Sequence, residues 1–119
     1  MNDELGATIA CIETVIDDMQ RVRALQSVEA RREIVALRRQ LFNAFAALGP
    51  AYRSGGSGGG TSDQEFDGRL AAVRHAIALH QSSWPAVLLD ERTPEYLASA
   101  DAVRGQIRDI LDWIARQSR

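Results

Sequence analysis

The chain has 119 residues, of which 45% are apolar, and a formal net charge of −2 with an isoelectric point near 5.6. This length suits one domain, which buries roughly two thirds of the surface that its unfolded chain exposes. The nearly balanced, slightly acidic charge gives no general attraction to nucleic acid or to anionic membranes, so we expect neither as a partner. No stretch approaches the ~18 consecutive apolar residues of a membrane span, and we expect no secretory signal in the acidic first residues.

Cys11 is the only cysteine, which excludes an intramolecular disulfide and a cysteine-based zinc cluster. A reducing cytoplasm is the simplest expectation for the location of the protein. We expect Cys11 itself to be buried or at the edge of the core, as small thiols usually are. All fourteen basic residues are arginine. Together with the abundant alanine, this composition indicates a GC-rich bacterial genome rather than a particular chemistry.

The first half of the chain has a helical apolar period that is interrupted once. Over residues 5–19, apolar residues recur at steps of three and four, and the same period resumes over residues 34–48. The polar stretch between these segments predicts a turn near Gln26 and Ser27, which would give two helices. A single helix over residues 3–48, roughly 70 Å long, is the alternative.

The middle of the chain predicts a helix end followed by a flexible connection. Glycine can adopt a left-handed conformation after the last helical turn and proline cannot continue a helix, so we expect the second helix to stop at Gly49 and Pro50. Residues 54–61 then hold five of the nine glycines, a composition typical of a flexible coil. Two interpretations of this segment remain open, a natural low-complexity loop or an inserted laboratory linker. In both, a single domain over residues 1–119 consists of a hairpin over 1–53 and a hairpin over 62–119.

The second half of the chain predicts two further helices. Ser62 begins a capping box, and Pro85 should end the helix that follows. Thr93 and Pro94 suit the N-cap and the first position of the last helix. The connection over residues 86–92 is unusually apolar, and we expect it to fold back onto the helices. Nothing has the pattern of a strand, so the sequence predicts an all-α antiparallel four-helix bundle made of two hairpins.

The two histidines do not have metal-ligand spacing. His75 and His80 are five residues apart, which separates them by about 140° around a helix, so one helix cannot direct both at one metal. Neither belongs to a Glu-x-x-His or His-Glu-x-x-His pattern. We therefore predict no metal and no cofactor. His75 should be exposed, and His80 should be a hydrogen-bonded residue of the core or its boundary.

Acidic and basic residues near the C-terminus have the spacing of salt bridges within a helix. Asp101 with Arg104, and Arg108 with Asp112, predict weak pairs worth about 0.2–0.5 kcal/mol each. We interpret these residues as a solvated helix face rather than as general acids and bases. The sequence therefore predicts no catalytic residue and a protein that is not an enzyme.

Aromatic side chains supply the candidate binding site. In one interpretation Trp84 and Trp113 close the two ends of the core. In the other, both belong to one apolar groove that accepts a partner helix or a small apolar ligand. The members of this predicted groove are Phe42, Phe45, His80, Trp84, Leu88 and Trp113.

The sequence therefore predicts a non-catalytic protein–protein interaction module, such as an adaptor, chaperone or regulator. It would act through the apolar groove on a protein partner, or on a second copy of itself in a homodimer. The alternative is a small-ligand-binding bundle or small helical enzyme with its site at the end that holds Trp84 and Trp113.

Overall fold

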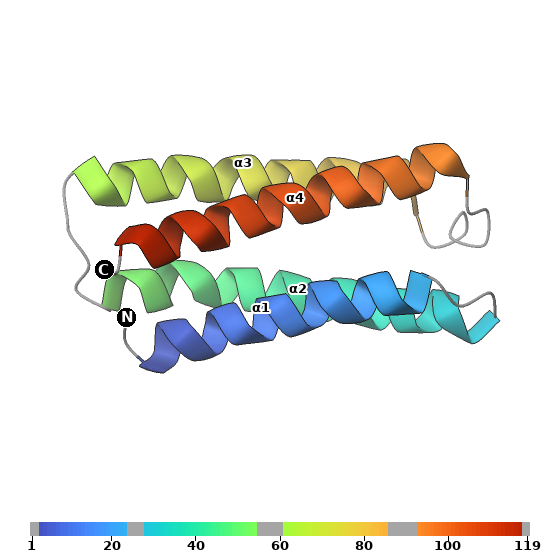
Figure 1. Cartoon of the computed structure of the whole chain (residues 1–119), viewed down its shortest axis with the longest axis horizontal. Helices are drawn as coiled ribbons and strands as arrows, with labels where there is room; N and C mark the ends of the chain where they lie inside the picture. Colours follow the sequence, from blue (N-terminus) through green and yellow to red (C-terminus); the bar gives the residue numbers. More distant parts are fainter. Residues whose placement is uncertain (1–2, 24–27, 55–60, 86–92, 118–119) are drawn as a thin grey trace.

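The computed structural model describes residues 3–23, 28–54, 61–85 and 93–117. These residues form four helices: α1 (Asp3–Arg23), α2 (Val28–Ser54), α3 (Thr61–Ser83) and α4 (Pro94–Gln117). Successive helices run in opposite directions, and α1 packs against α2 as α3 packs against α4 (Figure 1). The predicted all-α four-helix bundle with two hairpins is confirmed.

The first half of the chain contains two helices, so the turn interpretation is confirmed and the single helix over residues 3–48 is wrong. The first helix ends at Arg23, the second begins at Val28, and the two pack against each other as a hairpin. Gln26 and Ser27, where the turn was predicted, lie outside the described residues. The hairpin forms because each helix carries an apolar stripe that the other can cover.

The predicted apolar stripes form the core of the bundle. The stripe residues of α2, from Ile34 to Leu48, are all buried, and those of α1 and α4 are buried or packed at the edge of the core. Each large apolar side chain contributes about 1.5–3 kcal/mol when it is fully buried. The most deeply buried large side chains come from all four helices: Tyr52, Phe66, Leu5, Ile12, Leu48, Ile107, Ile110, Ile114 and Val22.

The predicted helix stop at Gly49 and Pro50 is wrong, because α2 continues through Pro50 to Ser54. A proline inside a helix removes one backbone hydrogen bond and costs about 3 kcal/mol. Ala51 and Tyr52 beyond it are completely buried, and burial and stacking of one aromatic ring offset a cost of about this size. Gly49 also helps, since a residue without a Cβ avoids part of the clash with the following proline ring.

An aromatic cluster of Tyr52, Phe66 and Trp113 joins the two hairpins. The rings of Tyr52 and Phe66 are nearly parallel, with centroids 4.0 Å apart, and the Trp113 ring lies 6.2 and 6.4 Å from them. The three side chains come from the end of α2, the start of α3 and the end of α4. Arg53 forms an ion pair with Asp67 across the same junction. The cluster therefore holds together the helix ends that flank the glycine-rich connection.

The helix ends of the second hairpin follow the predicted caps in part. The backbone N–H of Tyr96 donates a 3.2 Å hydrogen bond to Thr93 Oγ1, which confirms Thr93 as the N-cap of α4. The end of α3 before Pro85 is also confirmed. At its other end, however, α3 begins at Thr61. The helix therefore begins one residue before Ser62, the predicted N-cap.

The glycine-rich connection is shorter than predicted. Ser54 belongs to α2 and Thr61 to α3, so the outermost residues of the predicted 54–61 segment are helical. Residues 55–60, and the apolar connection over 86–92 that was expected to fold back, lie outside the described residues.

Cys11 is exposed, which corrects the expectation of a buried or boundary thiol. Its neighbour Ile12 is completely buried. One residue step turns an α-helix by about 100°, so the two side chains point in very different directions.

Arg104 and Arg108 of α4 pair with α1 and not with Asp101 and Asp112, their predicted partners within the helix. Arg104 Nη2 lies 3.3 Å from Asp17 Oδ1, and Arg108 Nη2 lies 2.9 Å from the same oxygen. Arg108 Nη1 also lies 3.9 Å from Glu13 Oε2. Because these groups are partly exposed, each pair stabilises the bundle by only about 0–1 kcal/mol. Their effect is to connect the first hairpin to the second along one edge.

We expect Tyr52→Ala to lower the free energy of unfolding by about 3–5 kcal/mol, because it removes the burial that offsets Pro50. Phe42→Ala is the matched control, since it deletes an aromatic side chain of similar size that is 71% exposed, and it should change stability by no more than about 0.5 kcal/mol. Urea unfolding followed by circular dichroism measures both. Equal losses would show that the aromatic cluster does not hold the hairpins together.

Candidate functional site

The six residues of the predicted groove do not form one site, because the structure separates the two tryptophans. Trp113 packs beside Phe66 at the start of α3, whereas Trp84 follows the end of α3 with its ring 5.5 Å from that of Tyr96. Eighteen positions separate Phe66 from Trp84, which is about 27 Å along a helix. The two tryptophans thus close opposite ends of the core, and no shared Trp84/Trp113 end exists. Leu88 lies outside the described residues.

Phe42 and Phe45 do come together, on a groove between α2 and α3 that we call the α2/α3 groove. Its volume is about 410 Å³, within the usual range of ligand-binding pockets. Phe45 is buried at its base, whereas Phe42 is 71% exposed at its edge. The groove is lined by Leu41, Phe42 and Phe45 of α2 and by Arg74, Ile77, Ala78 and Gln81 of α3.

The edges of the α2/α3 groove carry positive charge. Arg74 crosses one edge, and its Nη2 donates a long 3.4 Å hydrogen bond to the backbone oxygen of Phe45. On α2, the exposed side chains of Val35, Arg39 and Phe42 follow one another at steps of four and three, so they share one helix face. Among the described residues that line the groove, none is acidic. The groove is therefore an apolar channel between basic edges.

His80 is not part of this groove but of a polar cluster inside the bundle. Its Nδ1 lies 2.7 Å from Ser99 Oγ, and its ring stacks on Tyr96 with centroids 5.7 Å apart. The Tyr96 hydroxyl in turn accepts a 3.3 Å hydrogen bond from Arg23 Nε. Burial, reinforced by the positive charges of Arg38 and Arg23, lowers the pKa of His80 to about 4. His80 is therefore neutral at pH 7, a hydrogen-bonded core residue as predicted.

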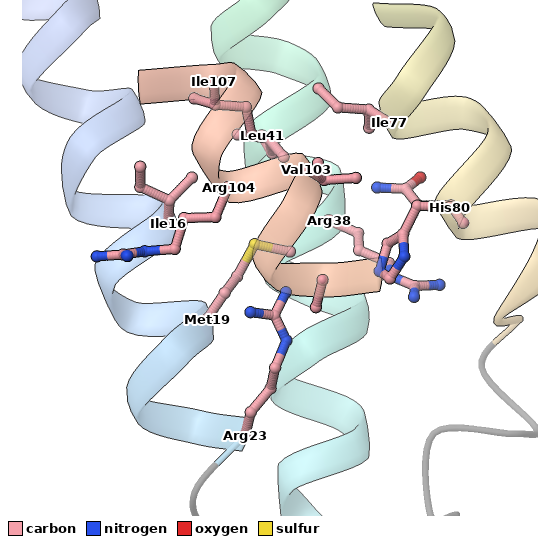
Figure 2. Close-up of a pocket in the computed structure, with 12 residues that line it drawn as sticks. Ile16, Met19, Arg23, Arg38, Leu41, Ile77, His80, Val103, Arg104 and Ile107 are labelled. Atoms are coloured by element: carbon pink, nitrogen blue, oxygen red, sulfur yellow. The ribbon is translucent and has the colours of Figure 1, made fainter. Parts of the chain in front are cut away.

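A small cavity lies beside His80, and we call it the arginine cavity. Its volume is about 20 Å³, enough for one water-sized species. Figure 2 shows side chains from all four helices around it. Burial lowers the pKa of Arg38, and the nearby charge of Arg23 acts in the same direction. The polar side chains that line the cavity are Arg23, Arg38, His80, Gln81 and Arg104.

The arginine cavity was not among the predicted sites, although the helical period contained a signal for it. Arg38 lies four residues after Ile34 and three before Leu41, both of which belong to the predicted stripe of α2. Arg23 likewise follows Met19 by four residues, and Arg104 follows Ala100 by four. Residues at this spacing share a helix face. A charged residue on an apolar stripe therefore marks a place where the interior is polar.

The described residues show neither a metal-binding cluster nor a membrane-spanning helix. No three His, Cys, Asp or Glu side chains among them gather closely enough to hold a metal ion. None of the described helices combines the length and the apolar character that crossing a bilayer requires.

Comparisons with known proteins give no relative of this chain. No protein-family model matches it, and no curated protein and no solved structure gives a significant match. The functional proposals therefore rest on the residues and contacts of the chain itself.

We expect the stability of the protein to fall as the pH decreases from 6.5 toward 4, in part because of His80. Over this range the unfolded chain binds a proton at His80 that the folded chain does not bind until about pH 4. The contribution of this difference to the free energy of unfolding is at most about 3 kcal/mol.

The measurement is urea unfolding at pH 4.5 and pH 7 for wild type and two variants. His80→Gln should lose part of the pH dependence, whereas His75→Gln, which alters an exposed histidine of the same helix, should keep it. A pH dependence that His80→Gln leaves unchanged would contradict this account of the buried imidazole.

Proposed function

We propose that the protein is a non-catalytic interaction module, such as an adaptor, chaperone or regulator, that binds an amphipathic helix of another protein in the α2/α3 groove. The main support is Phe42, a large aromatic side chain that is 71% exposed at the edge of an apolar groove of about 410 Å³. Exposed apolar surface of this kind is costly in water and is typical of binding sites. Aromatic side chains at such positions often supply much of the binding energy.

The shape of the groove favours a helix as its occupant. The groove-lining residues of α3 run from Arg74 to Gln81 at steps of three, one and three, which corresponds to about 10 Å, or two turns. A partner helix would lie over this length with apolar side chains at i, i+3 or i+4, and i+7. Two or three such side chains would cover Phe42 and the exposed part of the groove.

The charge of the groove edges favours a partner with acidic flanks. Arg74 lines the groove, Arg39 shares an exposed face of α2 with Phe42, and no acidic side chain among the described residues lines the groove. A second copy docked symmetrically through the same face would bring these arginines toward their own counterparts, which is unfavourable. We therefore propose a different protein as the occupant rather than a homodimer.

The residues that line the α2/α3 groove favour binding over catalysis. Arg74 is the only ionisable side chain among the described residues that line the groove. General acid–base or nucleophilic chemistry needs a group that can exchange a proton or attack the substrate, and neither an always-charged arginine nor the amide of Gln81 supplies one. The permanent positive charge of Arg74 beside an apolar groove suits recognition of an acidic helix.

The proposed location is the cytoplasm. Cys11 is the lone cysteine and is exposed on α1. An exposed thiol stays reduced in the cytoplasm, whereas an oxidising compartment would favour its pairing with a second chain.

The proposal predicts that Phe42→Asp lowers the affinity for a partner helix by about 30-fold. The probe is a displayed library of helical peptides with apolar residues at i, i+3 or i+4, and i+7 and with acidic flanks, selected on the wild-type protein. Fluorescence anisotropy then gives the dissociation constant of each selected peptide. Leu97→Asp adds the same charge at a partly exposed leucine of α4, outside the groove, and should change the affinity by less than about threefold.

Two results would contradict this proposal. Selected peptides that bind Phe42→Asp as tightly as wild type would show that the groove is not their site. Native mass spectra in which the wild type forms a dimer and Phe42→Asp does not would make a second copy the occupant instead of a partner.

A further inference from the structure

Two buried guanidinium nitrogens beside the arginine cavity have no hydrogen-bond partner. Arg38 Nη2 and Arg104 Nε are both buried and make no hydrogen bond. Arg104 keeps Asp17 as a partner through its Nη2, so Arg38 is the more poorly satisfied of the two. A buried donor without a partner loses its hydration and gains nothing in return, and the loss is larger when the group is charged.

The groups that face Arg38 do not neutralise it. From α1 comes Arg23, a second cation, and from α4 comes Tyr96, whose hydroxyl already accepts the hydrogen bond of Arg23. From α3 comes His80, which is neutral at pH 7 and shares a hydrogen bond with Ser99. Among the described residues that line the cavity, none is a carboxylate. Positive charge therefore accumulates in the interior without an anion from those residues.

The size and position of the cavity restrict what can supply that anion. A volume of about 20 Å³ admits one atom of the size of a water oxygen. The cavity also adjoins the α2/α3 groove, because Leu41, Ile77 and Gln81 line both. An oxygen atom could thus occupy the cavity while the rest of a small molecule extends past Gln81.

We propose that the arginine cavity binds the carboxylate group of a small organic acid, with one carboxylate oxygen in the cavity beside Arg38 and Arg23. A carboxylate matches the planar donor fork of a guanidinium and forms charge-assisted hydrogen bonds with it. Such a ligand would supply both the acceptor that Arg38 Nη2 lacks and the negative charge that the cluster lacks. This inference does not rest on the proposed function, because Phe42, which carries that proposal, does not line the cavity. A helix seated in the α2/α3 groove would, however, meet the part of the ligand that extends past Gln81.

Calorimetric titration of the full chain with sodium acetate at constant ionic strength tests the proposal. Wild type should bind acetate saturably, and Arg38→Gln should lower the affinity by about tenfold or more. Arg32→Gln is the matched control because it removes the same charge from an exposed arginine of α2 that lines neither the cavity nor the groove. Its affinity should stay within about twofold of wild type.

A second measurement needs no variant and therefore holds even if Arg38→Gln does not fold. Acetamide has nearly the shape of acetate without its charge, so the wild type should not bind it measurably. Acetate should also shift the guanidinium resonances of Arg38 in nitrogen-15 spectra of the wild type. Equal binding of acetamide, no saturable binding of acetate, or equal losses in the two arginine variants would overturn the proposal and leave water as the content of the cavity.

Discussion

The joining of the two hairpins depends on the stacked rings of Tyr52 and Phe66. Tyr52 lies on the turn of α2 that follows Pro50, and without its burial nothing would offset the hydrogen bond that the proline removes. Phe66 carries the contact into α3, and Trp113 extends it to α4. The ion pairs around Asp17 add only exposed contacts between α1 and α4. The aromatic cluster is therefore the part of the shared core that joins the two hairpins at the helix ends flanking residues 55–60.

The core is aromatic at one end of the bundle and partly polar farther along. Both candidate sites lie in the partly polar region. At the end that holds the glycine-rich connection, aromatic rings fill the core. Farther along, Arg38 and His80 occupy stripe positions, so apolar packing is incomplete and the arginine cavity remains (Figure 2). On the outer side of the same seam, α2 and α3 leave the α2/α3 groove between them. Both sites thus lie where the two hairpins meet without fully covering each other.

Helical period was sufficient to predict the four helices, their apolar faces and the cap at Thr93, because these depend on residues within a few turns of one another. The stop at Pro50 failed because a tertiary contact, the burial of Tyr52, outweighed a local rule. The pairing of Trp84 with Trp113 failed for a different reason: a stripe specifies a helix face but not an end of the bundle. Because α3 and α4 are antiparallel, their C-terminal ends lie at opposite ends of the bundle. Trp84 follows the C-terminal end of α3, whereas Trp113 lies near the C-terminal end of α4. Arg38 was not predicted as a site residue, although its position between Ile34 and Leu41 on the apolar stripe of α2 indicated a side chain that faces the bundle.

Pro50 also has a consequence for the order in which the chain folds. Each hairpin is built from contacts that are close in sequence, and such contacts form early. The last turn of α2, in contrast, gains little until the second hairpin brings Phe66 against Tyr52. We therefore expect this turn to form with or after the docking of the hairpins, so that interactions of Tyr52 are largely absent from the folding transition state. Loss of the Tyr52 ring would then accelerate unfolding and leave the folding rate almost unchanged, which makes the junction between the hairpins a determinant of the lifetime of the native state.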